Sequence, residues 1–82
     1  MVIVEFSPSF ERRIKKIKNL AVKIQLKKQI KKIVENPEIG KPMRYNRKGT
    51  REVYIAPFRL SYAYIETGDK LVFLDLYHKD IQ

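Results

Sequence analysis

Residues 51–77 read REVYIAPFRLSYAYIETGDKLVFLDLY, and this stretch decides the fold. It contains three runs rich in β-branched and aromatic residues, each with the length and composition of a strand. The runs cover 51–56, 58–66 and 70–77, and they are separated by Pro57 and by Thr67-Gly68-Asp69. Strands joined by connections this short pair antiparallel. The sequence therefore predicts a three-stranded antiparallel meander.

Alternation along each strand predicts which side chains share a face of the sheet. The middle strand divides into Leu60, Tyr62 and Tyr64 on one side and Arg59, Ser61, Ala63 and Ile65 on the other. The last strand divides into Val72, Leu74 and Leu76 against Leu71, Phe73, Asp75 and Tyr77. Both faces are fairly apolar, so periodicity leaves open which one is covered. Arg51 and Arg59 flank the Pro57 turn, and we expect them to converge in an antiparallel pair.

The residues before the meander predict a strand and two helices. Residues 2–6 are mostly β-branched and aromatic, which is typical of a strand. Ser7 is a suitable N-cap and Pro8 a suitable first residue for a helix, which Asn19 is expected to end. A second helix is predicted for 20–35, because Pro37 disfavours a helical conformation at the residue before it. A loop is expected for 38–49.

These elements predict an α+β fold in one domain covering 1–82. An N-terminal strand precedes an antiparallel helical hairpin, and the three-stranded meander follows. The first strand is expected to join the same, mainly antiparallel sheet, with the helices covering one of its faces.

Composition excludes several classes of protein. With no cysteine and one histidine among 82 residues, the sequence indicates neither disulfides nor a metal site. No apolar run reaches the roughly 18 residues of a membrane-spanning helix, and the first residues do not resemble a signal peptide. We expect a cytoplasmic protein with no cofactor, no small-molecule ligand and no membrane partner.

The positive charge is concentrated in the middle of the chain. The net charge is +9, from 18 Lys and Arg against 9 Asp and Glu. From Arg12 to Arg51 there are 15 basic residues against Glu35 and Glu38, a net charge of +13, and the rest of the chain carries −4. Such polarity attracts a polyanion. The polyanion would be a nucleic acid, an acidic protein or an anionic membrane. Alternatively, the positive charge serves only to keep the protein soluble.

Three motifs resemble those of the RelE/ParE toxins of toxin–antitoxin modules. They are Gly49-Thr50-Arg51-Glu52-Val53-Tyr54, Phe58-Arg59-Leu60-Ser61-Tyr62 and Leu74-Asp75-Leu76-Tyr77-His78-Lys79. The family shows a basic residue on its second strand, an aromatic-Arg-aliphatic-x-Tyr pattern on its third, and a pair of basic residues after its fourth. The resemblance covers nearly the whole chain in the same order.

The resemblance implies one of two activities. RelE-like members are mRNA interferases, endoribonucleases that enter the ribosomal A site and cut mRNA there. ParE-like members inhibit DNA gyrase and are not known as nucleases. Because the fold is shared, it does not choose between the two. A non-catalytic, basic nucleic-acid-binding protein is a third possibility.

For the nuclease, the resemblance implies a catalytic set without metal. Arg59 matches the central arginine of the family and suits bidentate binding of a phosphate; the alternative is a structural salt bridge with Glu52 or Asp75. Arg51 would stabilise charge or lie at a solvated strand end. Glu52 would act as a general base or pair with an arginine.

The end of the last strand contributes the remaining candidates. His78 is of the only side-chain type that ordinarily titrates near neutral pH, and some relatives place a histidine there as acid or base. Lys79 would hold a phosphate or serve solubility. Many active relatives carry a tyrosine a few residues further on, which this sequence lacks up to Gln82. Either the protein continues, or it uses another acid, or it is a weak catalyst.

Binding of RNA is assigned to the lysine row of the second predicted helix and to the basic loop, that is, to Lys23, Lys27, Lys31, Arg44, Arg47 and Lys48. The alternative is a solvated helix face. Tyr54, Tyr62, Tyr64 and Tyr77 could stack on bases, although their strand spacing is more typical of core residues. The partners implied by the resemblance are the ribosome, mRNA and a cognate antitoxin with an acidic or amphipathic segment that wraps the toxin.

Overall fold

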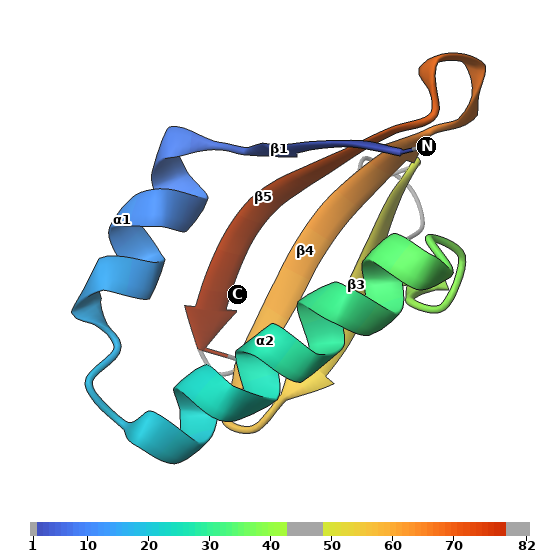
Figure 1. The fold of residues 1–82 in the computed structure, drawn as a ribbon. Coiled ribbons are helices and arrows are strands. Elements are labelled where there is room, and N and C mark those ends of the chain that lie inside the picture. The colour runs from blue at the N-terminus through green and yellow to red at the C-terminus, as the bar shows by residue number, and fades with distance from the viewer. Residues whose placement is uncertain (1, 43–48, 79–82) are drawn as a thin grey trace.

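The computed structural model describes residues 2–42 and 49–78, and it shows two helices on one face of a mixed sheet (Figure 1). The elements follow the predicted order, from strand through helices to meander. Their bounds are β1 Ile3–Phe6, α1 Pro8–Lys16, α2 Leu20–Glu35, β2 Lys41–Pro42, β3 Thr50–Ile55, β4 Phe58–Ile65 and β5 Lys70–His78. The α+β prediction is confirmed.

The sheet has the strand order β1-β5-β4-β3-β2. The meander β3-β4-β5 is antiparallel, as predicted, and β1 joins it as a parallel neighbour of β5. A short 3₁₀ turn at Glu66–Gly68 and a left-handed Asp69, with φ of 45°, close the β4–β5 hairpin. Within the expected loop, Lys41–Pro42 forms the short strand β2 against β3. Sequence periodicity has no means of detecting a strand of two residues.

Cross-strand pairing shows which face the helices cover. Leu60 and Tyr62 of β4 are fully buried on the helix side, together with Phe73 of β5. The opposite face, which we call the open face, carries Arg59 and Ser61. Alternation had left this choice open, and the helices decide it in favour of the more apolar set.

The alternation predicted for the last strand is wrong beyond Phe73. Tyr62 pairs with Phe73 but Ser61 pairs with Asp75, so β5 has one extra residue, a β-bulge at Leu74. The bulge changes the phase of the strand. Leu76 therefore shares the helix side with Phe73 instead of opposing it, and it is 2% exposed.

The helices begin where side-chain caps satisfy their first backbone N–H groups. The Ser7 hydroxyl accepts from the Phe10 N–H at 3.1 Å, and the same hydroxyl donates to the Leu74 carbonyl on β5. Asn19 both separates the helices and caps α2, because its side-chain oxygen accepts from the Ala21 and Val22 N–H groups. The main helix contacts are α1 with β5 and α2 with β3.

The core lies between the helices and the sheet. Stacked aromatic rings join β1, α1 and β5, with Phe6, Phe10 and Phe73 at centroid separations of 5.4–5.7 Å. The buried apolar residues are Phe10, Ile17, Leu26, Ile33, Ile55, Leu60, Tyr62, Leu71, Phe73 and Leu76. Burial of this kind is the main favourable term in folding.

Tyr62 ties the segment after α2 to the core. Its hydroxyl donates to the Pro37 carbonyl at 2.7 Å and accepts from the Gly40 N–H at 2.8 Å. A Cβ at Gly40 would lie 2.6 Å from that hydroxyl, so only glycine fits there. Burial raises the pKa of Tyr62, and the Gly40 hydrogen bond and nearby Arg51 offset part of that rise.

Replacing Tyr62 by phenylalanine should destabilise the protein more than the same change at Tyr64. Tyr62→Phe leaves the Gly40 N–H and the Pro37 carbonyl without their buried partner, a loss of about 1–3 kcal/mol. Tyr64 is half-buried and donates only to the Asp69 carboxylate, so Tyr64→Phe should cost less than about 1 kcal/mol. Urea unfolding of both variants measures this, and equal losses would contradict the role of the Tyr62 hydroxyl.

The raised pKa of Tyr62 also predicts a loss of stability at alkaline pH. Unfolding releases the phenol to its ordinary pKa of 10.0, so the unfolded chain ionises first. The stabilisation from Tyr62 is complete below pH 10 and is lost as the pH rises through the folded-state pKa. The free energy of unfolding, followed from pH 8 to 11, should fall more steeply for the wild type than for Tyr62→Phe. Parallel curves would refute the assignment.

Candidate functional site

Arg59, Glu52 and Tyr77 come together on the open face from three adjacent strands. In the β3–β4 pair Glu52 is opposite Ser61, and Tyr54 is opposite Arg59. In the β4–β5 pair Arg59 is opposite Tyr77. Side chains that are directly opposite or diagonal across strands lie within reach of one another. The register therefore brings the three functional groups into one cluster.

The Glu52 carboxylate is the centre of this cluster. One of its oxygens, Oε1, lies 3.5 Å from Nη1 of Arg59, and the other, Oε2, accepts a hydrogen bond from the Tyr77 hydroxyl. The Glu52 side chain is only 4% exposed, against 38% for Arg59. A buried carboxylate is costly unless it is paired and hydrogen-bonded, and Arg59 and Tyr77 meet that requirement.

Arg59 is partly exposed, so part of its guanidinium can contact a ligand. Its Nε is buried and has no hydrogen-bond partner among the described residues, while the side chain as a whole reaches the surface. Tyr54, 53% exposed, lies directly across from it on β3. The cluster thus offers a planar cation for a phosphate, a carboxylate and a phenol for proton transfer, and an exposed aromatic ring beside them.

Arg51 does not converge with Arg59, so that expectation is wrong. Arg51 pairs with Tyr62, three positions along the ladder from the Tyr54–Arg59 pair, and its side chain therefore lies on the helix side. There Nη1 donates to the Glu38 carbonyl at 3.0 Å and to the Gly40 carbonyl at 2.8 Å. These bonds hold the segment after α2, and they give Arg51 a structural task.

His78 is likewise separated from Arg59. It pairs with Phe58, whereas its neighbour Tyr77 pairs with Arg59. Consecutive strand residues point to opposite faces, so His78 lies at the helix side of the sheet end, where it lines a cavity with Arg13, Lys16 and Lys18. Lys79, the other candidate from the closing motif, lies outside the described residues.

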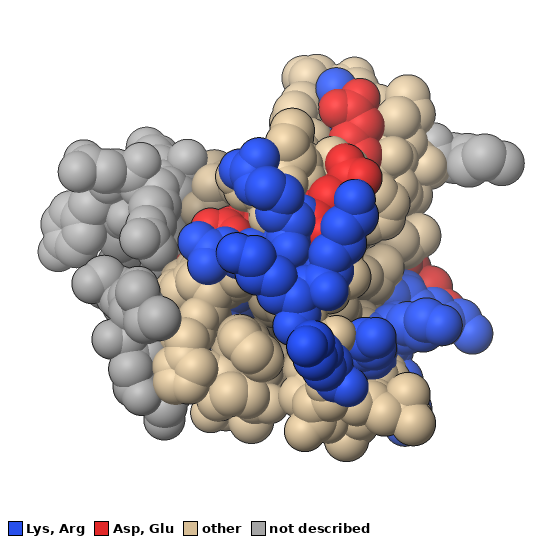
Figure 2. Space-filling view, turned by 90° about the vertical axis from the view of Figure 1, so that its left-hand side faces the viewer, with Lys and Arg blue, Asp and Glu red and all other residues tan. Residues whose placement is uncertain are grey.

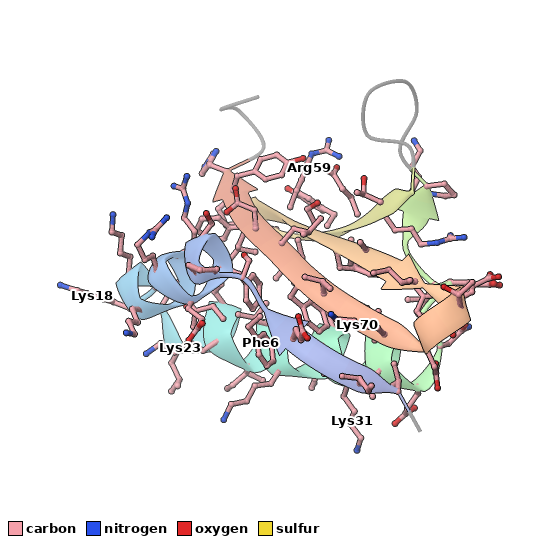
Figure 3. The ribbon with its side chains drawn as sticks, turned by 90° about the horizontal axis from the view of Figure 1, so that it is seen from above. Phe6, Lys18, Lys23, Lys31, Arg59 and Lys70 are labelled. Carbon is pink, nitrogen blue, oxygen red and sulfur yellow. The ribbon has the colours of Figure 1, made fainter. Side chains whose placement is uncertain are left out.

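The lysine row of α2 lies on the far side of the sheet from Arg59. Lys23, Lys27 and Lys31 are exposed, and Figure 3 shows Lys31 and Arg59 on opposite sides of the sheet. Figure 2 shows further Lys and Arg side chains over α1 and the start of α2. Arg44, Arg47 and Lys48 fall outside the residues that the structure describes.

Sequence reasoning did not place Tyr77 in a cluster with Arg59 and Glu52. Tyr77 was grouped with three other tyrosines as a possible stacking residue. Its place beside Arg59 depends on the bulge at Leu74, which alternation does not reveal. For the pairing of Glu52 with Arg59 a sequence signal was available. The two-residue turn at Pro57 fixes the β3–β4 register and so places Glu52 diagonally from Arg59.

Other kinds of site find little support in the part of the chain that is described. Within residues 2–42 and 49–78, neither helix is long and apolar enough to cross a membrane. Over the same ranges, no three His, Cys, Asp or Glu residues gather into a group that could hold a metal ion.

Comparison with solved structures finds the same fold. A chain of the E. coli RelBE toxin–antitoxin complex superposes with a TM-score of 0.80 at 18% identity, covering 95% of this chain and 96% of that one. A chain of the Mycobacterium tuberculosis RelBE2 complex gives 0.80 at 22%, covering 95% and 98%. YafQ from E. coli gives 0.70 at 23%, covering 98% and 96%.

Sequence comparison identifies the family. No curated protein sequence matches the chain. The model of a family described as "ParE toxin of type II toxin-antitoxin system, parDE" matches residues 4–82, which is nearly the whole sequence. The chain therefore belongs to this family of toxins, within the RelE/ParE superfamily.

Proposed function

We propose that this toxin is an endoribonuclease that cuts mRNA on the ribosome, with Arg59, Glu52 and Tyr77 as its catalytic residues. The observation that carries the proposal is the cluster on the open face. A partly exposed cation, a carboxylate and a phenol lie together there.

The chemistry is attack by a ribose 2′-hydroxyl on the adjacent phosphorus. An incoming phosphate competes with Glu52 for the Arg59 guanidinium, and Oε1 of Glu52 is then released to accept the 2′-hydroxyl proton. The 2′-oxygen bonds to phosphorus as the bond from phosphorus to the 5′-oxygen breaks, and Arg59 stabilises the charge that develops.

Tyr77 supplies the second proton transfer. Its phenol gives a proton to the departing 5′-oxygen, so the products are a 2′,3′-cyclic phosphate and a 5′-hydroxyl. Once the products leave, the proton held on Oε1 of Glu52 passes to the phenolate through solvent water, because the Tyr77 hydroxyl is hydrogen-bonded to the other carboxylate oxygen, Oε2. Both residues recover their starting states. Tyr77 thus serves as the general acid of the proposed mechanism.

Partners follow from the same proposal. The exposed lysines of α2 and the basic side chains of α1 would neutralise ribosomal RNA phosphates while the open face meets the mRNA. This assigns the toxin to the cytoplasm. The RelBE and RelBE2 relatives were solved as toxin–antitoxin complexes, which supports a cognate antitoxin as the partner that silences this toxin.

A second candidate is inhibition of DNA gyrase, and the family description favours it. The matching family is described as the ParE toxin, and ParE-like toxins act on gyrase. In that case the open-face cluster would be structural, and the toxin would bind gyrase without cutting RNA. Assays of the wild type on mRNA and on gyrase separate the two activities.

Arg59→Ala should abolish cutting of translated mRNA. Loss of the cation that stabilises the developing charge should slow cleavage roughly 10²–10³-fold. The measurement is cell-free translation of a defined mRNA with purified toxin, followed by primer extension to map the breaks.

Lys70→Ala is the matched control for Arg59→Ala. It also removes one positive charge from the sheet, at the opposite end of β5, where Lys70 pairs with Glu5 at 2.9 Å. It should cut as the wild type does. Wild-type protein that leaves mRNA intact but traps gyrase cleavage complexes would move the assignment to gyrase, and full cleavage by Arg59→Ala would remove Arg59 from the mechanism.

Glu52→Gln and Tyr77→Phe should each slow cleavage while leaving RNA binding intact. Each change removes one proton transfer, which is worth roughly 10²–10⁴-fold. Because both act in one cycle, the double variant should be little slower than the slower single variant. Single-turnover cleavage gives the rates, and retained affinity for uncleaved RNA checks the fold. If Tyr77→Phe cuts at the wild-type rate, another group is the acid.

A further inference from the structure

A cavity of about 310 Å³ lies at the end of the sheet, on the helix side, away from the open-face cluster. It opens where α1 passes into α2, next to the last residues of β5. His78, which the register turns away from Arg59, is part of its wall. The proposed catalytic cycle makes no use of this cavity, although four of its lining residues are cationic or titratable.

The floor of the cavity is apolar and partly aromatic. Ile17 and Leu76 are buried, at 8% and 2% exposure, and Val22 and Phe58 complete the surface. The Phe58 and His78 rings meet edge to face, with centroids 5.9 Å apart and planes at 78°. An apolar floor with an aromatic pair in its wall favours a flat aromatic guest over a hydrated ion.

The rim of the cavity is cationic. Arg13, Lys16 and Lys18 line it and are exposed. Asp75 neutralises part of the Arg13 charge, since its Oδ1 lies 3.5 Å from Nε of Arg13, and the two lysines remain in excess. Asn19, the N-cap of α2, also lines the cavity. The positive end of that helix dipole is therefore directed at the same place.

We propose that this cavity binds one unpaired nucleotide of a single-stranded RNA, with the base on the apolar floor and the adjoining phosphate at the Lys16–Lys18 rim. A nucleotide combines a flat aromatic group with an anion one sugar away, which matches the floor and the rim. Proteins recognise single-stranded RNA through this combination of stacking and phosphate neutralisation. The size lies at the lower end of the roughly 300–1,000 Å³ of small-molecule sites.

The cavity and the open face would hold different nucleotides of one strand. Arg59 and Tyr77 are one position along the ladder from Phe58 and His78, so a strand that rounds the sheet end reaches both. The inference takes RNA as the polyanion from the proposed function, but it requires no cleavage.

The test uses Arg59→Ala protein, so that RNA remains intact, and follows side-chain NMR signals during titration with a single-stranded RNA tetranucleotide. RNA should shift the signals of Val22, Phe58, Leu76 and His78, and inorganic phosphate should shift only the rim. Val22→Phe, which fills the cavity, and Lys18→Glu, which reverses the rim charge, should each weaken binding about tenfold, as expected for loss of a base stack or a phosphate contact.

Lys70→Glu is the matched control, because it makes the same charge reversal at the start of β5, at the far end of that strand from His78 and roughly 26 Å away along it. It should weaken binding clearly less than Lys18→Glu. Equal losses of RNA affinity in the two charge-reversal variants would overturn the proposal. So would cavity signals that shift with phosphate as they do with RNA, or that shift more strongly in a titration with an acidic peptide. NMR shifts confined to open-face residues would overturn the cavity proposal and leave the nuclease proposal intact. Shifts at the cavity from a toxin that does not cleave mRNA would support the cavity proposal without the nuclease proposal.

Discussion

The pairing of β4 with both of its neighbours is the constraint on which the rest of this structure depends. The β3 pairing places Glu52 on the open face and Arg51 on the covered one, and the β5 pairing places Tyr77 beside Arg59. Because the side-chain period of a strand is two, a slip of one residue would exchange every one of these positions. Tyr62 resists such a slip, since its buried hydroxyl is hydrogen-bonded to Pro37 and Gly40 in the segment after α2.

The sequence was enough to predict the order of elements, both helix starts and the meander, because each rests on local signals such as the Ser7 cap and the break at Asn19. That Asn19 also caps α2 is seen only in the structure. The candidate site was predicted only in part. The structure brings two of the candidates, Arg59 and Glu52, into contact, whereas the expected convergence of Arg51 with Arg59 failed. That expectation used proximity to the turn and ignored the parity of the ladder. The separation of His78 from Arg59, and the role of Tyr77, depend on side-chain phase, which a bulge alters without a clear local signal.

The two faces of the sheet divide the charge of the molecule. Lys and Arg side chains gather over α1 and the start of α2 (Figure 2), and Lys23, Lys27 and Lys31 of α2 are exposed. These charges act over distances set by ionic screening. On the open face, by contrast, Arg59 is held against a nearly buried carboxylate, where the interaction is short-ranged and geometrically specific. Long-range attraction of an anionic partner thus comes from the helix side, and the Arg59–Glu52 contact lies on the open face. A substitution on one of these surfaces need not disturb the other.

The bulge at Leu74 works as a frameshift in the alternation of β5. Without it, regular pairing from Phe73 onward would set Asp75 against Leu60 in the core and Leu76 beside Arg59. The extra residue restores a frame in which the carboxylate avoids the core and the phenol reaches the arginine. A sequence alignment of related β5 strands that allows no gap at Leu74 would therefore be wrong by one position for every residue after it. In such an alignment, a relative without the extra residue would seem to lack the tyrosine even where its own β5 places one on the open face.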